Sequence, residues 1–295
     1  MLLRYHQPPP SNGEPVTNFG DQLNAVLWPH LLGESFFDRD PSVAFLGIGS
    51  ILGYPKGGDS AHRFKIIFGT GAAFSEAAQR EPSDSRWRFY CVRGPLTARA
   101  YGLAESMAIT DPAILVSKFY KRDERSSYRF GYMPHITEAR AWEPMLRTSC
   151  ADLGILYIDP RSEVDEIIAG IASVSVVIAE AMHAAIVADA LRVPWIPLFT
   201  TRHPHRYKWT DWCGSLQMEY APHWVGNWAS LASRVRIRGP FVSYPAIVLF
   251  KRLMGRIMRA ARPCLSSPEV HSSLLERFES RINDFRDDVA TGLYS

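Results

Sequence analysis

A single histidine, His183, stands in the almost wholly apolar stretch SVSVVIAEAMHAAIVADALRVPWIPL, which covers residues 173–198. An imidazole changes charge near neutral pH, so a histidine held against a substrate can donate or accept a proton there. The alternative is a histidine whose hydrogen bonds are satisfied inside the core. The polar interruptions exclude a membrane span, which needs about 20 predominantly apolar residues. We therefore expect this segment to belong to a soluble fold.

Basic side chains supply candidate anion-binding groups. Arg93 directly follows the apolar run WRFYCV (87–92), where a guanidinium could hold a carboxylate or phosphate through two parallel hydrogen bonds. The alternative is an ordinary surface arginine. The segment TTRHPHRYKW (200–209) gathers further basic and histidine side chains that suit an anionic ligand: Arg202, His203, His205, Arg206 and Lys208. No carboxylate has recognisable metal-ligand spacing to its His-x-His pair, so we expect no metal site.

A glycine-containing turn precedes the first predicted helix and contains Asn18, Gly20 and Asp21. Glycine would let the backbone approach a ligand closely at this turn. An equally good interpretation is that Asp21 simply caps the helix. Glycines at positions 47, 49, 53, 69 and 71 also follow or end predicted strands, but they do not form the G-x-G-x-x-G pattern. A dinucleotide site is therefore only weakly supported.

Short apolar runs alternate with helical patterns along the chain, which predicts an α/β fold with parallel sheets. In the first half, a helix within 20–32 precedes strands within 42–52, 64–71, 87–92 and 107–110. In the second half, strands are predicted within 130–136, 153–160, 174–179 and 193–198, with helices at 162–172 and from Met182. The polar stretch KRDERSSYR (121–129) indicates a link between two domains, which we place at residues 1–122 and 123–295.

Both chemical candidates occupy the same kind of position in this pattern. Arg93 and His183 each follow a predicted strand and come at or just before the start of a helix. In open parallel sheets, ligands bind outside the carboxyl ends of the strands, where helix N-termini offer unpaired N–H groups. This placement favours a functional role for His183 over burial in the core.

Composition narrows the class of protein. A hydrophobic content of 46% and a charged content of 21% are those of a globular protein, and the net charge of +3 with no readable module argues against nucleic acid as a partner. Four cysteines without a C-x-x-C pair suggest neither a zinc site nor a disulfide framework. The first residues are too poor in apolar side chains for a signal peptide. We therefore expect a cytoplasmic protein.

The C-terminal part contains a basic amphipathic helix, predicted at 246–261. Its apolar face carries Phe250, Leu253, Met254 and Ile257, with arginines turned away, and no acidic residue occurs between 234 and 262. Such a helix could lie on an anionic membrane surface or pack back on the core. A last helix, starting at 267–268, carries an ordinary packing stripe.

Several motifs occur in an order that resembles one family: NFGDQLN, FGTGAAF, CVRGPLTARAYGL, ITDPAIL, GYMPH and VIAEAMHAAIVADALRVPWIPL. From about Asn18 to about Tyr220 the chain resembles the polysaccharide pyruvyl transferases, in particular their exopolysaccharide, succinoglycan-type branch. The resemblance implies two Rossmann-like domains facing a cleft, as in glycosyltransferases of the B type, followed by C-terminal helices. It also implies transfer of the pyruvyl group of phosphoenolpyruvate to two hydroxyls of a sugar, with a cyclic ketal and phosphate as products.

Carried over position by position, the family's basic donor-binding residue falls on Arg93 and its catalytic histidine on His183. Many members have Arg-Leu-His where this chain has Ala181-Met182-His183. The lost arginine removes one donor contact and makes Glu180 a candidate partner of the histidine. The predicted substrate-binding residues are Asn18, Gly20, Asp21, Asp111, His135, Glu180, Met182 and Lys208.

In this hypothesis, His183 is the general acid/base, while Arg93 and Lys208 hold the donor carboxylate and phosphate without a metal or other cofactor. Asn18 and Asp21 contact the sugar acceptor from the opposite domain. The acceptor could be a lipid-linked oligosaccharide, which would place the protein at the inner face of the cell membrane through the 246–261 helix. Two alternatives remain: a nucleotide-sugar glycosyltransferase on the same scaffold, and a catalytically silent scaffold in polysaccharide assembly.

Overall fold

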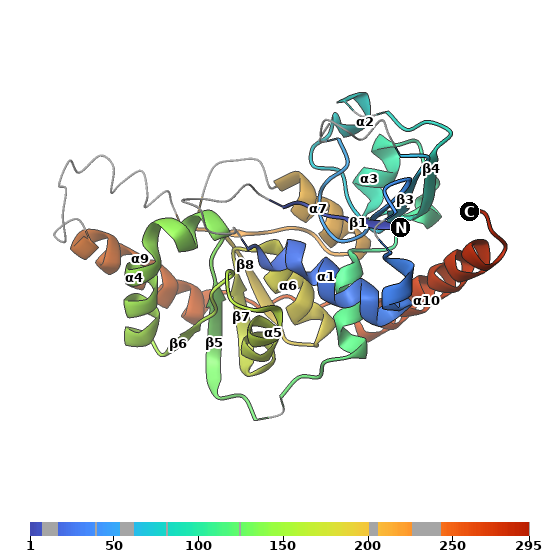
Figure 1. Cartoon of the computed structure of the whole chain (residues 1–295). Helices are drawn as coiled ribbons and strands as arrows, with labels where there is room; N and C mark the ends of the chain where they lie inside the picture. Colours follow the sequence, from blue (N-terminus) through green and yellow to red (C-terminus); the bar gives the residue numbers. More distant parts are fainter. Residues whose placement is uncertain are drawn as a thin grey trace. The chain divides into compact units, whose positions relative to one another are not determined.

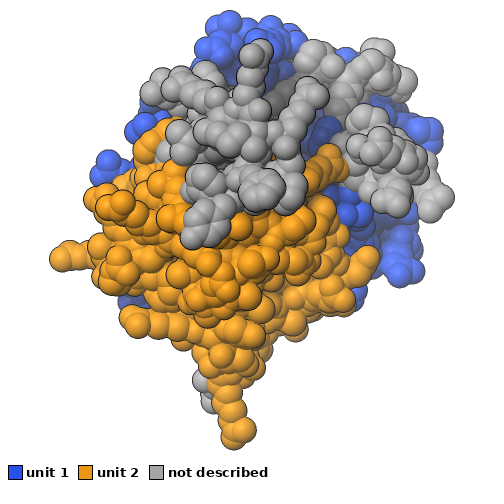
Figure 2. Space-filling view, turned by 90° about the vertical axis from the view of Figure 1, so that its left-hand side faces the viewer, with its two compact units in different colours: residues 1–116, 204–220, 266–295 blue, residues 117–203, 221–265 orange. Residues whose placement is uncertain are grey.

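The computed structural model describes residues 1–7, 17–38, 40–53, 62–80, 82–123, 125–200, 206–225 and 243–294, with only the backbone described for 243–246. The chain forms two compact units, each described here by itself. Unit 1 comprises residues 1–116, 204–220 and 266–295, and unit 2 comprises residues 117–203 and 221–265 (Figure 2). The predicted domains, 1–122 and 123–295, do not include the two later returns of the chain to unit 1.

Unit 1 is built on a parallel four-stranded sheet whose spatial order follows the chain. Its strands are β1 (Leu2–Arg4), β2 (Val43–Leu46), β3 (Phe64–Phe68) and β4 (Trp87–Cys91). Its helices are α1 (Phe19–Leu32), α2 (Ala77–Arg80), α3 (Pro95–Ala100), α7 (Arg206–Ser215) and α10 (Pro268–Ala290), with the short 3-10 helices η1 (Glu34–Phe36) and η3 (Glu105–Met107). A further 3-10 helix, η4 (Pro112–Lys118), contains the boundary with unit 2. The predicted strand at 107–110 is wrong, because only a single bridge joins Val92 to Ala108.

Aromatic side chains fill the core of unit 1. Trp28 of α1 packs edge-on against Phe45 and Phe68, with ring centroids 4.8 and 5.2 Å apart. Phe285 of α10 contacts the same two sheet residues. A second cluster, which includes residues of α2 and α3 and Tyr207 of α7, packs around Ile67 and Trp87. The two helices farthest apart in sequence, α1 and α10, are thus held by one set of sheet aromatics.

Helix α1 begins one residue earlier than predicted, at Phe19, with Asn18 as the N-cap residue. Asp21 therefore does not cap the helix; it lies in the first turn and accepts a hydrogen bond from the Asn18 side chain at 2.7 Å. The buried Asn24 amide, one turn later, donates to Ile48 O at 3.0 Å and accepts from Ile48 N at 2.8 Å. This pair of bonds fixes the start of α1 against the loop that follows β2.

Unit 2 is built on a parallel sheet in which the strand order reverses direction. Its strands are β5 (Tyr128–Met133), β6 (Ile155–Tyr157), β7 (Val174–Ala179), β8 (Trp195–Phe199) and β9 (His223–Trp224), in the order β6-β5-β7-β8-β9. Its helices are α4 (Ile136–Asp152), α5 (Val164–Ala172), α6 (Met182–Ala190) and α9 (Ser243–Ala260). Helices α4 and α9 cover one side of the sheet, and α5 and α6 the other (Figure 1). A mixed α/β fold with parallel sheets is therefore confirmed.

The basic helix α9 packs on the core of unit 2. Phe250, Met254 and Ile257 are buried in the same cluster as Tyr132 of β5 and Leu146 of α4. The apolar face of this helix therefore meets the core, whereas Arg252, Arg256 and Arg259 are exposed. Within the described ranges, the structure contains no helix that is both long and apolar enough to cross a membrane.

Candidate functional site

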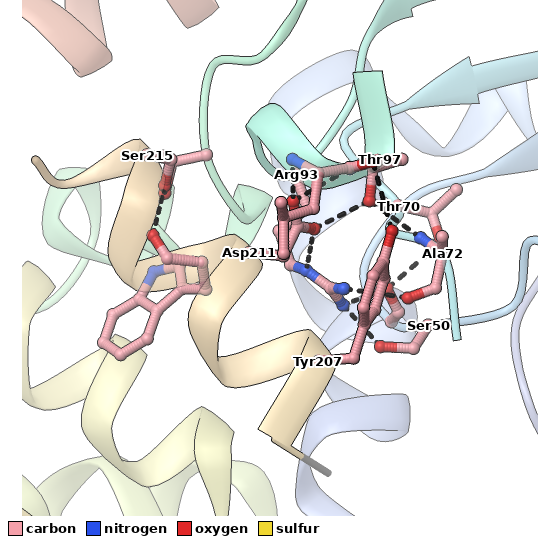
Figure 3. Close-up of polar contacts among 12 residues, drawn as sticks. Ser50, Thr70, Ala72, Arg93, Thr97, Tyr207, Asp211 and Ser215 are labelled. Carbon is pink, nitrogen blue, oxygen red and sulfur yellow. Dashed lines mark hydrogen bonds and ion pairs between the residues drawn. The ribbon is translucent and has the colours of Figure 1, made fainter. Parts of the chain in front are cut away.

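The carboxyl ends of β2, β3 and β4 bring together loop residues that are far apart in the sequence. Ser50 follows β2, Thr70 follows β3, and Arg93 follows β4. Because neighbouring parallel strands end at the same edge of a sheet, these loops converge there, as Figure 3 shows for the three side chains. We call this the unit 1 edge.

The Arg93 guanidinium is completely buried at the unit 1 edge, and each of its nitrogens has a partner. Nε donates to Asp211 Oδ2 at 3.0 Å, and Nη2 donates to the carbonyl oxygen of Ala72 at 3.0 Å. Nη1 donates to the Gly49 carbonyl at 3.4 Å and to the half-buried Ser50 hydroxyl. Two of these four partners are side chains, Asp211 and Ser50. An incoming anion could take the place of the Ser50 hydroxyl while Asp211 keeps its bond.

Asp211 of α7, which the sequence interpretation missed, completes this cluster (Figure 3). Besides Arg93, its carboxylate accepts from the backbone N–H groups of Leu96 and Thr97 at 2.9 and 3.0 Å and from the Thr97 hydroxyl at 2.7 Å. Asp211 thus caps α3 from another segment of the chain, a favourable place for a negative charge. The only sequence signal is its position in DWCGSL, directly after the basic segment.

Two glycines allow this close packing. A Cβ added to Gly71 would lie 2.2 Å from Arg93 Cζ, and one added to Gly94 would lie 2.1 Å from the Asp211 carbonyl oxygen. Both distances are far below van der Waals contact, so any side chain would push the ion pair apart. Gly71 is one of the glycines that gave weak support for a dinucleotide site, and in the structure it makes room for Arg93.

Lys208 of α7 is the half-buried cation of the unit 1 edge. Desolvation, together with the positive charge of Arg93, lowers the pKa of Lys208 to about 8, while Asp21 and Asp111 act in the opposite direction. The structure thus brings five of the predicted residues together in unit 1, since Asn18 is bonded to Asp21. Asp111 is buried and accepts from Ala113 N at 3.0 Å. Gly20 is buried in the first turn of α1.

The predicted residues of unit 2 gather at the point where its strand order reverses. The chain passes from β5 through α4 to β6 on one side and returns through α5 to β7 on the other, so β5 and β7 form a topological switch point. His135 follows β5, while Glu180, Met182 and His183 follow β7. A switch point is where open parallel sheets leave a crevice for ligands. We call this the unit 2 edge.

Glu180 is buried and links the elements of the unit 2 edge. Its carboxylate accepts from the Tyr132 hydroxyl at 3.0 Å, from the His135 backbone N–H at 3.1 Å and from the Thr200 hydroxyl. Burial raises the pKa of Glu180, and these three donors partly offset the increase. These contacts with three donors explain why a carboxylate is tolerated inside an apolar region.

Glu138, in the first turn of α4, is a second buried carboxyl group that the sequence interpretation missed. Its side chain is 7% exposed, and its Oε2 has no hydrogen-bond partner in the described part of the chain. Burial and the negative charge of Glu180 raise the pKa of Glu138 to about 7. The residue lies three positions after His135, a spacing typical of a helix start rather than of a site, so no sequence pattern singled it out.

His183 is half-buried and is the second residue of α6, directly after the buried Met182 that begins the helix. His135 is the N-cap residue of α4, with Nδ1 2.8 Å from the Thr137 hydroxyl. Helix starts at the carboxyl edge therefore position both imidazoles, as the sequence predicted for His183.

The predicted residues Arg202, His203 and His205 lie outside the described residues. Among the described residues, no group of three or more His, Cys, Asp or Glu side chains could hold a metal ion.

Comparisons with known proteins agree with these positions. Residues 60–198, a range that contains Arg93 and His183, match the family described as polysaccharide pyruvyl transferase. The chain is 36% identical over 212 residues to the succinoglycan biosynthesis protein ExoV of Rhizobium meliloti (strain 1021); this alignment covers 70% of the chain and 64% of that relative's length. No solved structure matches the chain significantly. The chain thus belongs to the polysaccharide pyruvyl transferase family, in its exopolysaccharide branch.

Proposed function

We propose that this protein transfers the pyruvyl group of phosphoenolpyruvate to two hydroxyls of a sugar in an exopolysaccharide or its lipid-linked precursor. The product is a cyclic pyruvate ketal, and phosphate is released. The observation that carries the proposal is the position of His183, which lies inside the family match and at the switch-point edge of a parallel sheet. A relative involved in succinoglycan biosynthesis supports the polysaccharide context.

The residue types suit this reaction. A proton must be delivered to the C3 methylene of the donor so that C2 gains cationic character and a hydroxyl can attack it. In the proposal His183 is the general acid/base for this transfer. Met182, Glu180 and His135 lie at the same unit 2 edge.

Lys208 and Arg93 are the proposed donor-binding cations. With a pKa of about 8, Lys208 is mostly protonated at pH 7 and can bind a phosphate or carboxylate. Arg93 would contact the donor by exchanging the Ser50 hydroxyl for a donor oxygen while keeping Asp211. Asp111 belongs to the same group of charges, and Asn18, Gly20 and Asp21 are the proposed acceptor contacts. Positive charge near the leaving phosphate stabilises it as the bond breaks.

Further parts of the proposal rest on the resemblance to the family. The two units would adopt the glycosyltransferase-B-like arrangement of two Rossmann-like domains, with both edges serving one donor. The reaction would need no metal or other cofactor. The protein would act in the cytoplasm, at the inner face of the membrane if the acceptor is lipid-linked, with the outward arginines of α9 as the peripheral contact.

The first test is the thermal stability of the purified protein with phosphoenolpyruvate, with a nucleotide sugar, and with neither. A ligand at 100 times its Kd stabilises the folded state by about 2.7 kcal/mol, which is readily seen as a rise in melting temperature. We expect a rise with phosphoenolpyruvate that Lys208→Met reduces and that the matched change at the exposed Lys118, Lys118→Met, leaves intact. A rise with the nucleotide sugar alone would show that the protein is a glycosyltransferase instead.

A further inference from the structure

We propose that, of the two buried carboxyl groups Glu138 and Glu180, Glu138 carries a proton while Glu180 is ionised, and that Glu138 is a second acid–base residue at the unit 2 edge. The role in transfer rests on the proposed function; the protonation of Glu138 does not. The two carboxyl groups differ in their hydrogen-bond donors.

Glu180 is the member suited to carry the negative charge. Two hydroxyls and one backbone N–H donate to its oxygens, and donors of this kind stabilise the ionised form. A buried carboxylate with three donors is a common and stable arrangement.

Glu138 is the member suited to carry the proton. It is as buried as Glu180, with 7% and 8% exposure respectively, yet its Oε2 receives no hydrogen bond within the described ranges. A buried carboxylate without donors is costly, whereas the neutral acid is not. The charge of Glu180 adds to this preference and contributes to a pKa of about 7 for Glu138.

Other charged groups around α4 do not offset this effect. Arg147 pairs with Glu143 and Asp159, and Lys251 of α9 pairs with Asp152 at the far end of the helix. Arg161 is also paired with Glu143 and Asp159. On the β5 side, Tyr132 stays neutral, because burial and the charge of Glu180 raise its pKa well above the ordinary value. The imidazole of His135 is a further titratable group, at the N-cap of the same helix.

The proposed reaction has a use for a second proton-carrying group. Adding one sugar hydroxyl across the donor double bond forms a C2–O bond and a C3–H bond. The second hydroxyl forms another C2–O bond as the bond from C2 to the phosphate oxygen breaks. Two hydroxyl protons are therefore released, one being balanced by the proton gained at C3 and one leaving with phosphate. In the proposal, His183 and Glu138 each carry out one of these proton transfers.

The protonation of Glu138 is tested by carboxyl NMR of the full-length protein labelled with ¹³C at glutamate side chains, with the Glu138 signal identified by its loss in Glu138→Gln. We expect this signal to titrate near pH 7. Its pKa should fall when Glu180→Gln removes the neighbouring charge, but stay above the ordinary 4.5 because burial, the larger cause of the shift, remains. Thr200→Val is the second variant: it removes a donor from Glu180, shifts the proton toward Glu180, and lowers the pKa of Glu138. A signal that titrates near 4.5 in the wild type, or that neither variant moves, overturns the proposal.

The role in transfer is tested by calorimetry of phosphoenolpyruvate binding at pH 7.5 in buffers of different ionisation enthalpy, which counts the protons taken up. An anionic ligand should draw a fraction of a proton onto Glu138, and Glu138→Gln should lose this uptake. Glu166→Gln is the matched control, because Glu166 is exposed and is the third residue of α5, as Glu138 is of α4. Equal uptake in wild type and Glu138→Gln overturns the role. If phosphoenolpyruvate does not bind the wild type, the proposed function fails and this role with it, while the NMR result still decides whether Glu138 carries the proton.

Discussion

The unit 1 edge and the unit 2 edge both place charged side chains at the carboxyl ends of parallel strands, but they differ in how many of the charged atoms have hydrogen-bond or ion-pair partners. Arg93 and Asp211 are fully buried and every charged atom has a partner. At the unit 2 edge, Glu138 is almost as buried and keeps an oxygen without a donor in the described part of the chain. Fully paired charges fix a local structure, whereas incompletely paired ones have shifted pKa values and are suited to proton transfer.

The largest effect on stability should come from breaking the pair at the unit 1 edge. Arg93→Ala leaves Asp211 as a buried charge without its cation, which costs about 3–5 kcal/mol. Urea unfolding would measure this loss. Arg86→Ala is the control, since its pair with Asp84 is exposed and such pairs are worth at most about 1 kcal/mol. Equal costs for the two variants would mean that the Arg93–Asp211 pair is no more structural than a surface pair.

A smaller loss should follow when the pair is kept but crowded. Gly71→Ala would place a methyl group 2.2 Å from Arg93 Cζ and force the guanidinium to move, at a cost of about 2–3 kcal/mol. Gly170 lies in helix α5, where alanine is the better helix former, and a methyl group added there would lie 3.4 Å from its nearest neighbour, Ile158 Cγ1. Unfolding curves should therefore shift in opposite directions. A neutral Gly71→Ala would show that the edge has room that the structure does not indicate.

The unit 2 edge should instead make the free energy of unfolding depend on pH. Folding raises the pKa of Glu138 from 4.5 to about 7, so the folded state binds the proton more tightly than the unfolded state. The resulting stabilisation of the fold is fully present below pH 4.5 and is lost as the pH rises through 7. The full shift corresponds to about 3 kcal/mol, of which relaxation should leave about 1–2 kcal/mol. Glu138→Gln should therefore gain stability relative to the wild type between pH 5 and pH 8, by this amount. Glu166→Gln should show no such change in urea unfolding across the same range; a flat difference for both variants would exclude a perturbed Glu138.

Sequence patterns predicted the elements of this fold better than the contacts between them. The run VSVVIA predicted β7 at its observed bounds, and the helical spacing from Met182 predicted α6, because local periodicity is enough to define a strand and a helix. The partners of Arg93 and Glu180 could not be predicted. Asp211 lies more than a hundred residues from Arg93, and such a pairing is set by chain topology, which periodicity does not encode.

The division of the chain into units shows the same limit. The polar stretch at 121–129 lies close to the end of the first passage through unit 1, which the contacts place at Val116. The return of α7 and α10 to unit 1 has no local signal, since an amphipathic helix does not specify which sheet it covers. The apolar stripe of α10 was predicted, but its partners Phe45 and Phe68 were not.

The smallest effect on stability should accompany the largest effect on activity. His183 is half-buried, and Gln keeps a polar side chain there, so His183→Gln should change the free energy of unfolding by no more than about 0.5 kcal/mol. Loss of a general acid/base should still slow transfer by roughly 10²–10⁴-fold. Transfer of label from radiolabelled phosphoenolpyruvate into the saccharide fraction of cells that express the variant would measure the second effect. If His183→Gln instead unfolds as readily as Arg93→Ala, the histidine holds the fold together as Arg93 does, and the contrast between the fully paired Arg93 and the reactive His183 is lost.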